Sequence, residues 1–138
     1  DFAHTPDALA KSLNALKNSY GERISLVFGC GGERDQGKRK LMGKVAEKFA
    51  DIVFITDDNP RNEDPASIRN EIASYCKKSI NVDGREKAIS KAISTMKKND
   101  ILLIAGKGHE KTQDINGKVS LFDDELVAKK YFYKRFSL

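Results

Sequence analysis

Three short segments rich in glycine and charge each follow a run of apolar residues, at positions 29–39, 57–61 and 106–110. Arginine can hold a carboxylate through two parallel hydrogen bonds, and an acidic side chain can accept from an ammonium group. A small ligand that carries both groups, or a phosphate ester, would suit a site built from these segments. They suit neither a sugar nor an apolar cofactor.

The first segment partly matches the phosphate-binding P-loop pattern. Gly32, Gly37 and Lys38 fall at the required spacing, but Arg39 stands where that pattern has serine or threonine. Arginine offers no hydroxyl to magnesium, which argues against a nucleotide P-loop. The dinucleotide fingerprint fails as well, because Arg34 takes the place of its last glycine. A backbone nest with Arg34, Lys38 and Arg39 would still attract an anion, and the alternative is a tight strand-to-helix turn.

The second segment places opposite charges around a rigid proline. Arg61 can grip a carboxylate, whereas Asp58 and Asn59 can accept from an ammonium group. These residue types, with Pro60, would also fit a plain turn that leads into a helix.

The third segment offers backbone donors at Gly106 and Gly108 and a carboxylate at Glu110. The roles of Lys107 and His109 stay open, since a lone histidine is more often a hydrogen-bonded surface residue than a catalyst. No cysteine and histidine spacing resembles a zinc site.

The three segments come together if the apolar runs before them are neighbouring parallel strands. Residues 24–28, 52–55 and 101–104 are continuous apolar runs, typical of strands covered on both faces, and 80–82 is a candidate short strand. Ligands bind outside the carboxyl ends of such strands. Helices are expected from Thr5-Pro6-Asp7 to Gly21, over 38–49 with Leu41 inward, after Asp64-Pro65, after a cap at Asp83, and from a cap at Asp123 to about Phe136. Asn116-Gly117 predicts a hairpin turn. The prediction is an α/β, Rossmann-like three-layer domain with a mostly parallel sheet and a C-terminal β-hairpin.

Size and composition indicate one soluble domain. The chain has 138 residues, of which 39% are hydrophobic and 33% charged, and it has no apolar run long enough for a membrane span. Its two cysteines, Cys30 and Cys76, form no framework, which favours a reducing, cytoplasmic setting. The net charge of +5 is dispersed and lacks interleaved aromatic residues, so neither a nucleic acid nor a membrane is expected as a partner. Because the chain opens on Asp1 without a methionine, we expect it to be part of a longer protein.

Four motifs, in order along nearly the whole chain, resemble the C-terminal domain of the Mur ligase family. They are DFAHTPD at 1–7, FGCGGERDQGKR at 28–39, TDDNPR at 56–61 and AGKGHE at 105–110. The DNPR tetrapeptide is similar to the motif of the members that add meso-diaminopimelate. Members that add lysine lack the arginine at the position of Arg61.

The resemblance implies a set of residues that contact meso-diaminopimelate, with none that is catalytic: Arg34, Asp58, Asn59, Pro60, Arg61, Gly106 and Glu110. Arg61 would clamp the distal carboxylate, which lysine lacks, and an unpaired guanidinium would penalise lysine. Asp1 and His4 resemble the part of the family pattern near ATP, although a segment leading into the first helix explains them as well.

The implied reaction is ATP-dependent amide formation in peptidoglycan precursor synthesis. ATP phosphorylates the D-glutamyl carboxylate of UDP-N-acetylmuramoyl-L-alanyl-D-glutamate, and the amine of meso-diaminopimelate attacks the acyl phosphate. By this resemblance, residues 1–138 bind the amino acid and close over ATP, while ATP and Mg²⁺ are held mainly by a central domain absent here. The N-terminal domain, which holds the UDP substrate, is absent too. We therefore expect contacts to the missing domains and no activity of the chain alone.

Three positions depart from the family pattern: Phe2 replaces a tyrosine, Glu33 an aspartate and Lys40 a proline. Other hypotheses stay open at this point. The chain could be an amino-acid-binding module without chemistry, a nucleotide hydrolase built on the P-loop-like segment, or a related Mur ligase for another amino acid. Arg61 argues against lysine as that amino acid.

Overall fold

The computed structural model describes residues 3–136, and its centre is a four-stranded sheet in which all strands are parallel. The strands are β1 (Ile24–Phe28), β2 (Ile52–Ile55), β3 (Ser79–Asn81) and β4 (Ile101–Ile104), in the order β3-β2-β1-β4. In the register, Leu26 of β1 lies opposite Val53 of β2 and Leu103 of β4. The predicted parallel sheet is confirmed, and its three apolar strands have the expected bounds.

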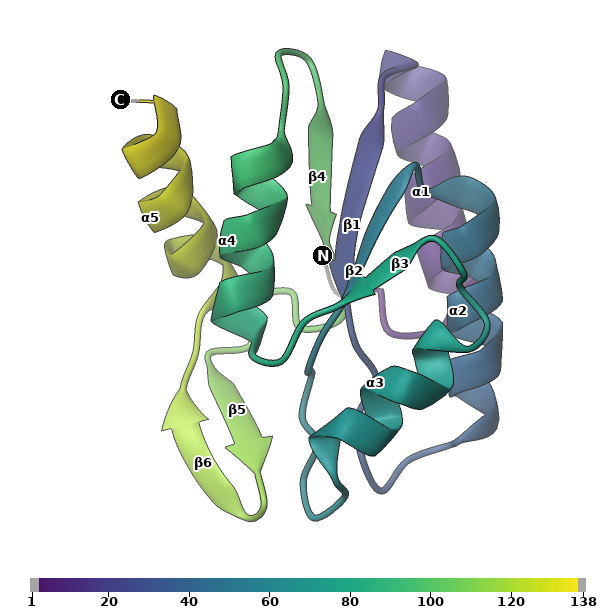
Figure 1. Ribbon diagram of the computed structural model, residues 1–138, viewed down its shortest axis with the longest axis vertical. Helices are drawn as coiled ribbons and strands as arrows, with labels where there is room; N and C mark the ends of the chain where they lie inside the picture. Colours follow the sequence, from purple (N-terminus) through teal and green to yellow (C-terminus); the bar gives the residue numbers. More distant parts are fainter. Residues whose placement is uncertain (1–2, 137–138) are drawn as a thin grey trace.

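Helices cover both faces of the sheet, which gives the predicted three layers (Figure 1). The helices are α1 (Pro6–Tyr20), α2 (Gly37–Phe49), α3 (Pro65–Ala73), α4 (Arg85–Thr95) and α5 (Asp124–Phe136). The first three pack on one face, and α4 and α5 pack on the other.

Alternate residues of each strand supply the two cores. Leu26 and Phe28 are fully buried against α1, α2 and α3, whereas Val27 and Phe54 are buried toward α4 and α5. Each such side chain stabilises the fold by about 1.5–3 kcal/mol, so both helical layers are needed to hold the strands in place. The strand ends that carry the three polar segments are therefore fixed by two cores.

The predicted hairpin is present and forms a separate two-stranded sheet, seen below α4 and α5 in Figure 1. Its antiparallel strands are β5 (Thr112–Ile115) and β6 (Lys118–Leu121). Asn116 and Gly117 join them with φ angles of 55° and 77°, the left-handed pair that a two-residue turn of this type requires.

Two of the predicted helix caps are confirmed. The Oγ1 atom of Thr5 accepts a hydrogen bond from the backbone N–H of Ala8 at 3.2 Å. The Oδ1 atom of Asp123 accepts from the backbone N–H groups of Glu125 and Leu126 at 3.0 and 3.2 Å. These bonds satisfy N–H groups that the first helical turn leaves without partners.

Two other local predictions are wrong. Gly84, with a φ of 95°, precedes α4 in place of Asp83, and the exposed Asp83 carboxylate pairs with Arg69 at 3.5 Å. Leu41 points outward and is 51% exposed, because Met42 takes the inward place on that turn of α2.

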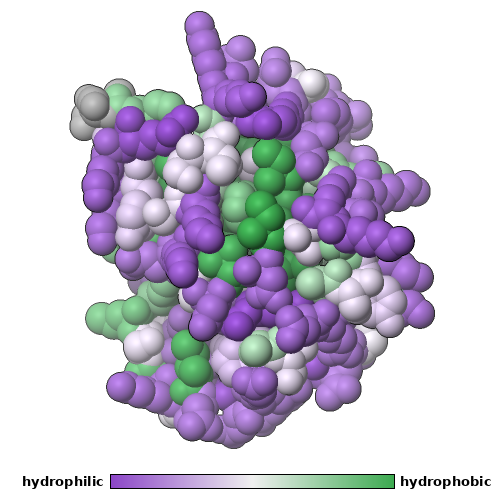
Figure 2. All heavy atoms as spheres, viewed as in Figure 1, coloured by the Kyte–Doolittle hydropathy of each residue, from purple (hydrophilic) through white to green (hydrophobic). Residues whose placement is uncertain are grey.

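No helix within residues 3–136 is long and apolar enough to cross a membrane. Figure 2 shows that the face in view is mostly polar, with an apolar strip near its middle.

Candidate functional site

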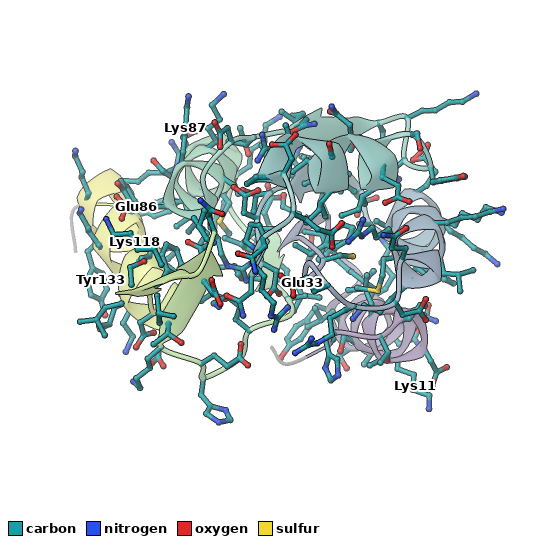
Figure 3. All side chains as sticks on the ribbon, turned by 90° about the horizontal axis from the view of Figure 1, so that it is seen from below. Lys11, Glu33, Glu86, Lys87, Lys118 and Tyr133 are labelled. Atoms are coloured by element: carbon teal, nitrogen blue, oxygen red, sulfur yellow. The ribbon has the colours of Figure 1, made fainter. Side chains whose placement is uncertain are left out.

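A cavity of about 340 Å³ lies outside the carboxyl ends of β1, β2 and β4, where the three polar segments meet. Figure 3 looks onto this edge of the sheet, with Glu33 of the first segment between the hairpin and helices α1 and α2. The cavity is lined by His4, Gly29, Cys30, Gly31, Arg34, Lys38, Asp58, Asn59, Arg61, Gly106 and Glu110. Segments 29–39, 57–61 and 106–110 thus form one site, as their places after parallel strands predicted.

Most of the sequence-predicted binding residues line this cavity, and so does His4, which was expected near a nucleotide. Pro60 does not line it. That residue is buried, and its carbonyl accepts from the N–H of Glu63 at 3.1 Å. Asp1 lies outside the described residues. Lys38, which the sequence suggested only as an attractor of anions, does line the cavity.

Glycines let the first and second segments pack backbone against backbone. A Cβ atom on Gly32 would lie 1.9 Å from the carbonyl oxygen of Pro60, and one on Gly29 would lie 2.2 Å from that of Thr56. The Gly32 N–H donates to the Asn59 carbonyl at 2.8 Å. Glycine is therefore needed at these two positions because the backbones of the two segments approach closely, more than because of the conformation of a turn.

The backbone of Arg61 adopts the left-handed conformation, with a φ of 53°. Its N–H donates to the Asp114 carbonyl at 3.0 Å, and its carbonyl accepts from the Asn116 N–H at 2.5 Å. Its Nη1 atom donates to the Gly32 carbonyl at 2.9 Å. Pairing with the hairpin therefore holds an unfavourable backbone conformation at a residue that lines the cavity, and the bond to Gly32 fixes its guanidinium.

The hairpin supports the rest of the second segment too, a role that sequence reasoning missed. Gln113 Nε2 donates to the Asp58 carbonyl at 2.7 Å, and the Asp114 N–H donates to Asn59 Oδ1 at 3.0 Å. The sequence signalled the turn at Asn116 but carried no sign that β5 would pair with a loop 55 residues earlier.

The two neighbouring aspartates after β2 do different work. Asp57 is 6% exposed, binds Arg69 Nη1 at 2.6 Å and accepts from the Gly84 N–H at 3.1 Å, so its carboxylate is structural. Asp58 lines the cavity. Its Oδ2 atom lies where Gly106, with a φ of 111°, lacks a side chain, 2.7 Å from the position of a Cβ. Gly106 thus makes room for the acidic group of the site.

A buried ion pair ties the ends of two strands together. Arg85 is 1% exposed and binds the carboxylate of Asp124 through Nε and Nη2, at 2.8 and 2.7 Å. Its Nη1 and Nη2 atoms donate to the carbonyls of Asp57 and Ala105, both at 3.1 Å. The Arg85 guanidinium therefore fixes the backbone at the start of both the second and the third segment.

Arg39 does not face the cavity, and the prediction that it would attract an anion is wrong. Its side chain is buried and binds Glu63 at 2.8 Å and Glu71 at 2.9 Å. Glu63 also accepts from the Glu33 N–H at 2.5 Å, and its pKa is lowered, chiefly by the hydrogen bond from Arg39. Arg39 ties α2 to α3 and to the loop after Pro60, which leaves its charge satisfied by protein.

Lys107 is fully buried, and its Nζ atom donates to Asn59 Oδ1 at 3.2 Å and to the Thr112 carbonyl at 2.5 Å. Asn59 Oδ1 also accepts from the backbone of β5, so this oxygen is not open to an ammonium group as the sequence suggested.

Burial raises the pKa of the Cys30 thiol to about 12, which leaves it a neutral part of the cavity wall. Within residues 3–136, no three side chains of the kinds that hold metal ions come together.

The charges that remain accessible have both signs. Arg34, Lys38 and Arg61 can hold carboxylates, and Asp58 and Glu110 can hold ammonium groups. A cavity of this size, with polar groups that converge from three loops, suits one small dipolar molecule.

The sequence of this chain is similar to those of known proteins. Residues 1–108 match the family described as "Mur ligase, glutamate ligase domain". The chain is 52% identical to the UDP-N-acetylmuramoyl-L-alanyl-D-glutamate--2,6-diaminopimelate ligase of Rickettsia typhi, covering 96% of this chain and 28% of that protein. It is 50% identical to the protein of that name from Buchnera aphidicola, with 98% and 28% covered.

Solved structures show the same fold. One titled as a 2,6-diaminopimelate ligase of that kind superposes with a TM-score of 0.92 at 39% identity, over 99% of this chain and 29% of that one. A folylpolyglutamate synthase/dihydrofolate synthase from Yersinia pestis has a TM-score of 0.62 at 15% identity, over 100% of this chain and 28% of that one, and shares the fold alone. The chain spans little more than a quarter of the length of the ligases that it matches. From this match over most of its length, the chain belongs to the C-terminal domain family of the Mur ligases.

Proposed function

We propose that this chain is the amino-acid-binding domain, over residues 1–138, of a cytoplasmic ligase that joins meso-diaminopimelate to UDP-N-acetylmuramoyl-L-alanyl-D-glutamate. The reaction uses ATP, passes through an acyl phosphate, and serves peptidoglycan synthesis. The remaining length of the relatives leaves room for the domains that hold the UDP substrate and ATP. Two unpaired thiols support the reducing setting of the cytoplasm.

The observation that carries the proposal is the arrangement of charge in the cavity, where three cations and two carboxylates converge. Meso-diaminopimelate has two carboxylates and two ammonium groups, so each of its charged groups finds a partner of opposite sign. Arg61, held by its contacts with β5 and Gly32, is the residue that we assign to the distal carboxylate. L-Lysine lacks that carboxylate, and it would leave the positive charge of the Arg61 guanidinium without a counter-ion.

The side chains of residues 3–136 do not fit a site for Mg²⁺. Arg39 stands where a P-loop has its hydroxyl and is paired with two glutamates, which also argues against a nucleotide hydrolase built on this loop. We assign ATP and Mg²⁺ mainly to a central domain outside this chain, with residues 1–138 closing over ATP. The described residues then bind and orient the amino acid, and we assign none of them as a general base.

An Arg61→Ala substitution in the full-length ligase tests the assignment. We expect the substitution to lower kcat/KM for meso-diaminopimelate, because one partner of a charge pair is removed. The loss corresponds to about 2–5 kcal/mol of transition-state stabilisation. Lys91→Ala, at an exposed position of α4, is the matched control and should leave kcat/KM unchanged. If kcat/KM survives Arg61→Ala, the assigned clamp is wrong. If the wild-type ligase binds meso-diaminopimelate but forms no amide, the hypothesis of a binding module without chemistry replaces the ligase.

A further inference from the structure

Lys107, the buried lysine of the third segment, contacts the side-chain amide of Asn59, and this contact bears on which atom of the amide faces the cavity. Lys107 is 0% exposed, and its Nζ atom lies 3.2 Å from Asn59 Oδ1. Burial of an ammonium group is unfavourable unless its protons have acceptors. The Thr112 carbonyl at 2.5 Å and Glu110 Oε1 at 3.8 Å supply further acceptors. The lysine is therefore anchored independently of any ligand.

The Asn59 amide receives a second donor from the hairpin, the backbone N–H of Asp114 at 3.0 Å. An ammonium group and a backbone N–H can only donate, and of the two ends of an amide only the oxygen can accept. The opposite orientation would set the amide N–H₂ against two donors and leave all of them unsatisfied. The oxygen must therefore face Lys107 and β5, and Nδ2 is the end left for the cavity that Asn59 lines.

We propose that Lys107 is a positioning residue that fixes the amide of Asn59, so that this side chain donates from Nδ2 to a carboxylate of the bound amino acid. Asn59 then acts beside Arg61, and the ammonium groups are left to Asp58 and Glu110. The orientation of the amide follows from contacts within the chain, whereas the identity of the ligand rests on the proposed function.

The direction in which one substitution changes ligand affinity separates this role from the alternative in which Asn59 accepts from an ammonium group. Asn59→Asp keeps an oxygen toward Lys107 and Asp114 but presents a second oxygen, with negative charge, in place of the N–H₂ group. We expect the unfolding free energy to be retained, while affinity of the full-length ligase for meso-diaminopimelate falls by at least about tenfold through repulsion of the carboxylate. Retained or stronger binding would overturn the proposal.

The part played by Lys107 is measured by a double-mutant cycle. Lys107→Met keeps the length and the apolar stem of the side chain but removes the donor. If Lys107 acts through Asn59, Lys107→Met should weaken binding about tenfold in the wild-type background and by less than about twofold in the Asn59→Ala background. A residue that only fills space would give equal losses in both backgrounds, and that result would overturn the positioning role.

One readout needs no ligand and no substitution. In the ¹³C,¹⁵N-labelled chain, a scalar coupling across the hydrogen bond from the Asp114 N–H to the side-chain carbonyl of Asn59 reports that the oxygen accepts. We expect this coupling in the wild type, and its loss or weakening in Lys107→Met if that variant folds. Its absence from the wild type would overturn the proposal even if meso-diaminopimelate binds. Its presence without binding of meso-diaminopimelate would uphold the orientation and remove the proposed substrate.

Discussion

Gly32→Ala should damage the site through the backbone, without removing any group that meets a ligand. The new Cβ would lie 1.9 Å from the Pro60 carbonyl oxygen and 2.7 Å from its carbon. Both atoms belong to the backbone, so the two loops must separate by about 1 Å before the contact becomes tolerable. The hydrogen bonds from Gly32 N–H to Asn59 and from Arg61 Nη1 to Gly32, now 2.8 and 2.9 Å long, would be stretched or broken.

The cost follows from these contacts. Overpacking and the loss of two hydrogen bonds together should lower the unfolding free energy by about 1–3 kcal/mol. For a domain of this length that corresponds to a fall in Tm of roughly 3–10 °C. Because Arg61 would lose an anchor, affinity for meso-diaminopimelate should fall as well. Thermal unfolding and ligand titration of the same variant measure both effects.

Gly37→Ala is the matched control within the same loop. Its Cβ would meet only the flexible Asp35 side chain, at 3.3 Å, and Gly37 is the first residue of α2. Alanine favours a helix over glycine, so we expect no loss of stability and unchanged binding. If Gly32→Ala behaves like Gly37→Ala, the reasoning that glycine is needed for close packing of the two loops is refuted.

Three further outcomes are expected. Asp124→Ala should lower the unfolding free energy measured in urea by about 3–5 kcal/mol, since it leaves Arg85 buried without its counter-ion; a loss typical of a surface pair would contradict this. Burial raises the pKa of Cys30 to about 12 and that of Cys76 to about 11. Iodoacetamide at pH 8 should therefore label both thiols only after unfolding. Rapid labelling of the native chain would refute this prediction. The pKa of Asp100 is lowered, chiefly by a hydrogen bond from an arginine, so its carboxylate stabilises the fold above its unfolded pKa and loses this effect as pH falls through the folded value. The stability difference between wild type and Asp100→Asn should thus be full at pH 6 and shrink below about pH 4, and a difference independent of pH would contradict it.

The position of the site was predictable because it depends on strands that local sequence specifies. The runs Ile24–Phe28, Ile52–Ile55 and Ile101–Ile104 are apolar without alternation, which marks strands buried on both faces. Parallel strands bring their carboxyl ends to one edge, so the polar segments after them had to meet.

The roles of single side chains were harder to predict because they depend on partners far away in the sequence. Arg39 carries the charge of an anion-binding residue, and only its pairing with Glu63 and Glu71 shows that this charge is already satisfied. Asn59 could have offered either end of its amide until Lys107, 48 residues later, was placed beside it. The pairing of Arg61 with β5 is of the same kind, because a left-handed arginine has no local sequence signal.

The proposed selectivity for meso-diaminopimelate is tested most directly by titrating the full-length protein with this amino acid, monitored by amide NMR signals or calorimetry, with L-lysine as the matched ligand. We expect binding of meso-diaminopimelate with signal changes at Arg34, Asp58, Asn59, Arg61, Gly106 and Glu110, together with much weaker binding of L-lysine. Equal binding of the two ligands, or changes that avoid these residues, would contradict the claim that this cavity selects an amino acid with a second carboxylate.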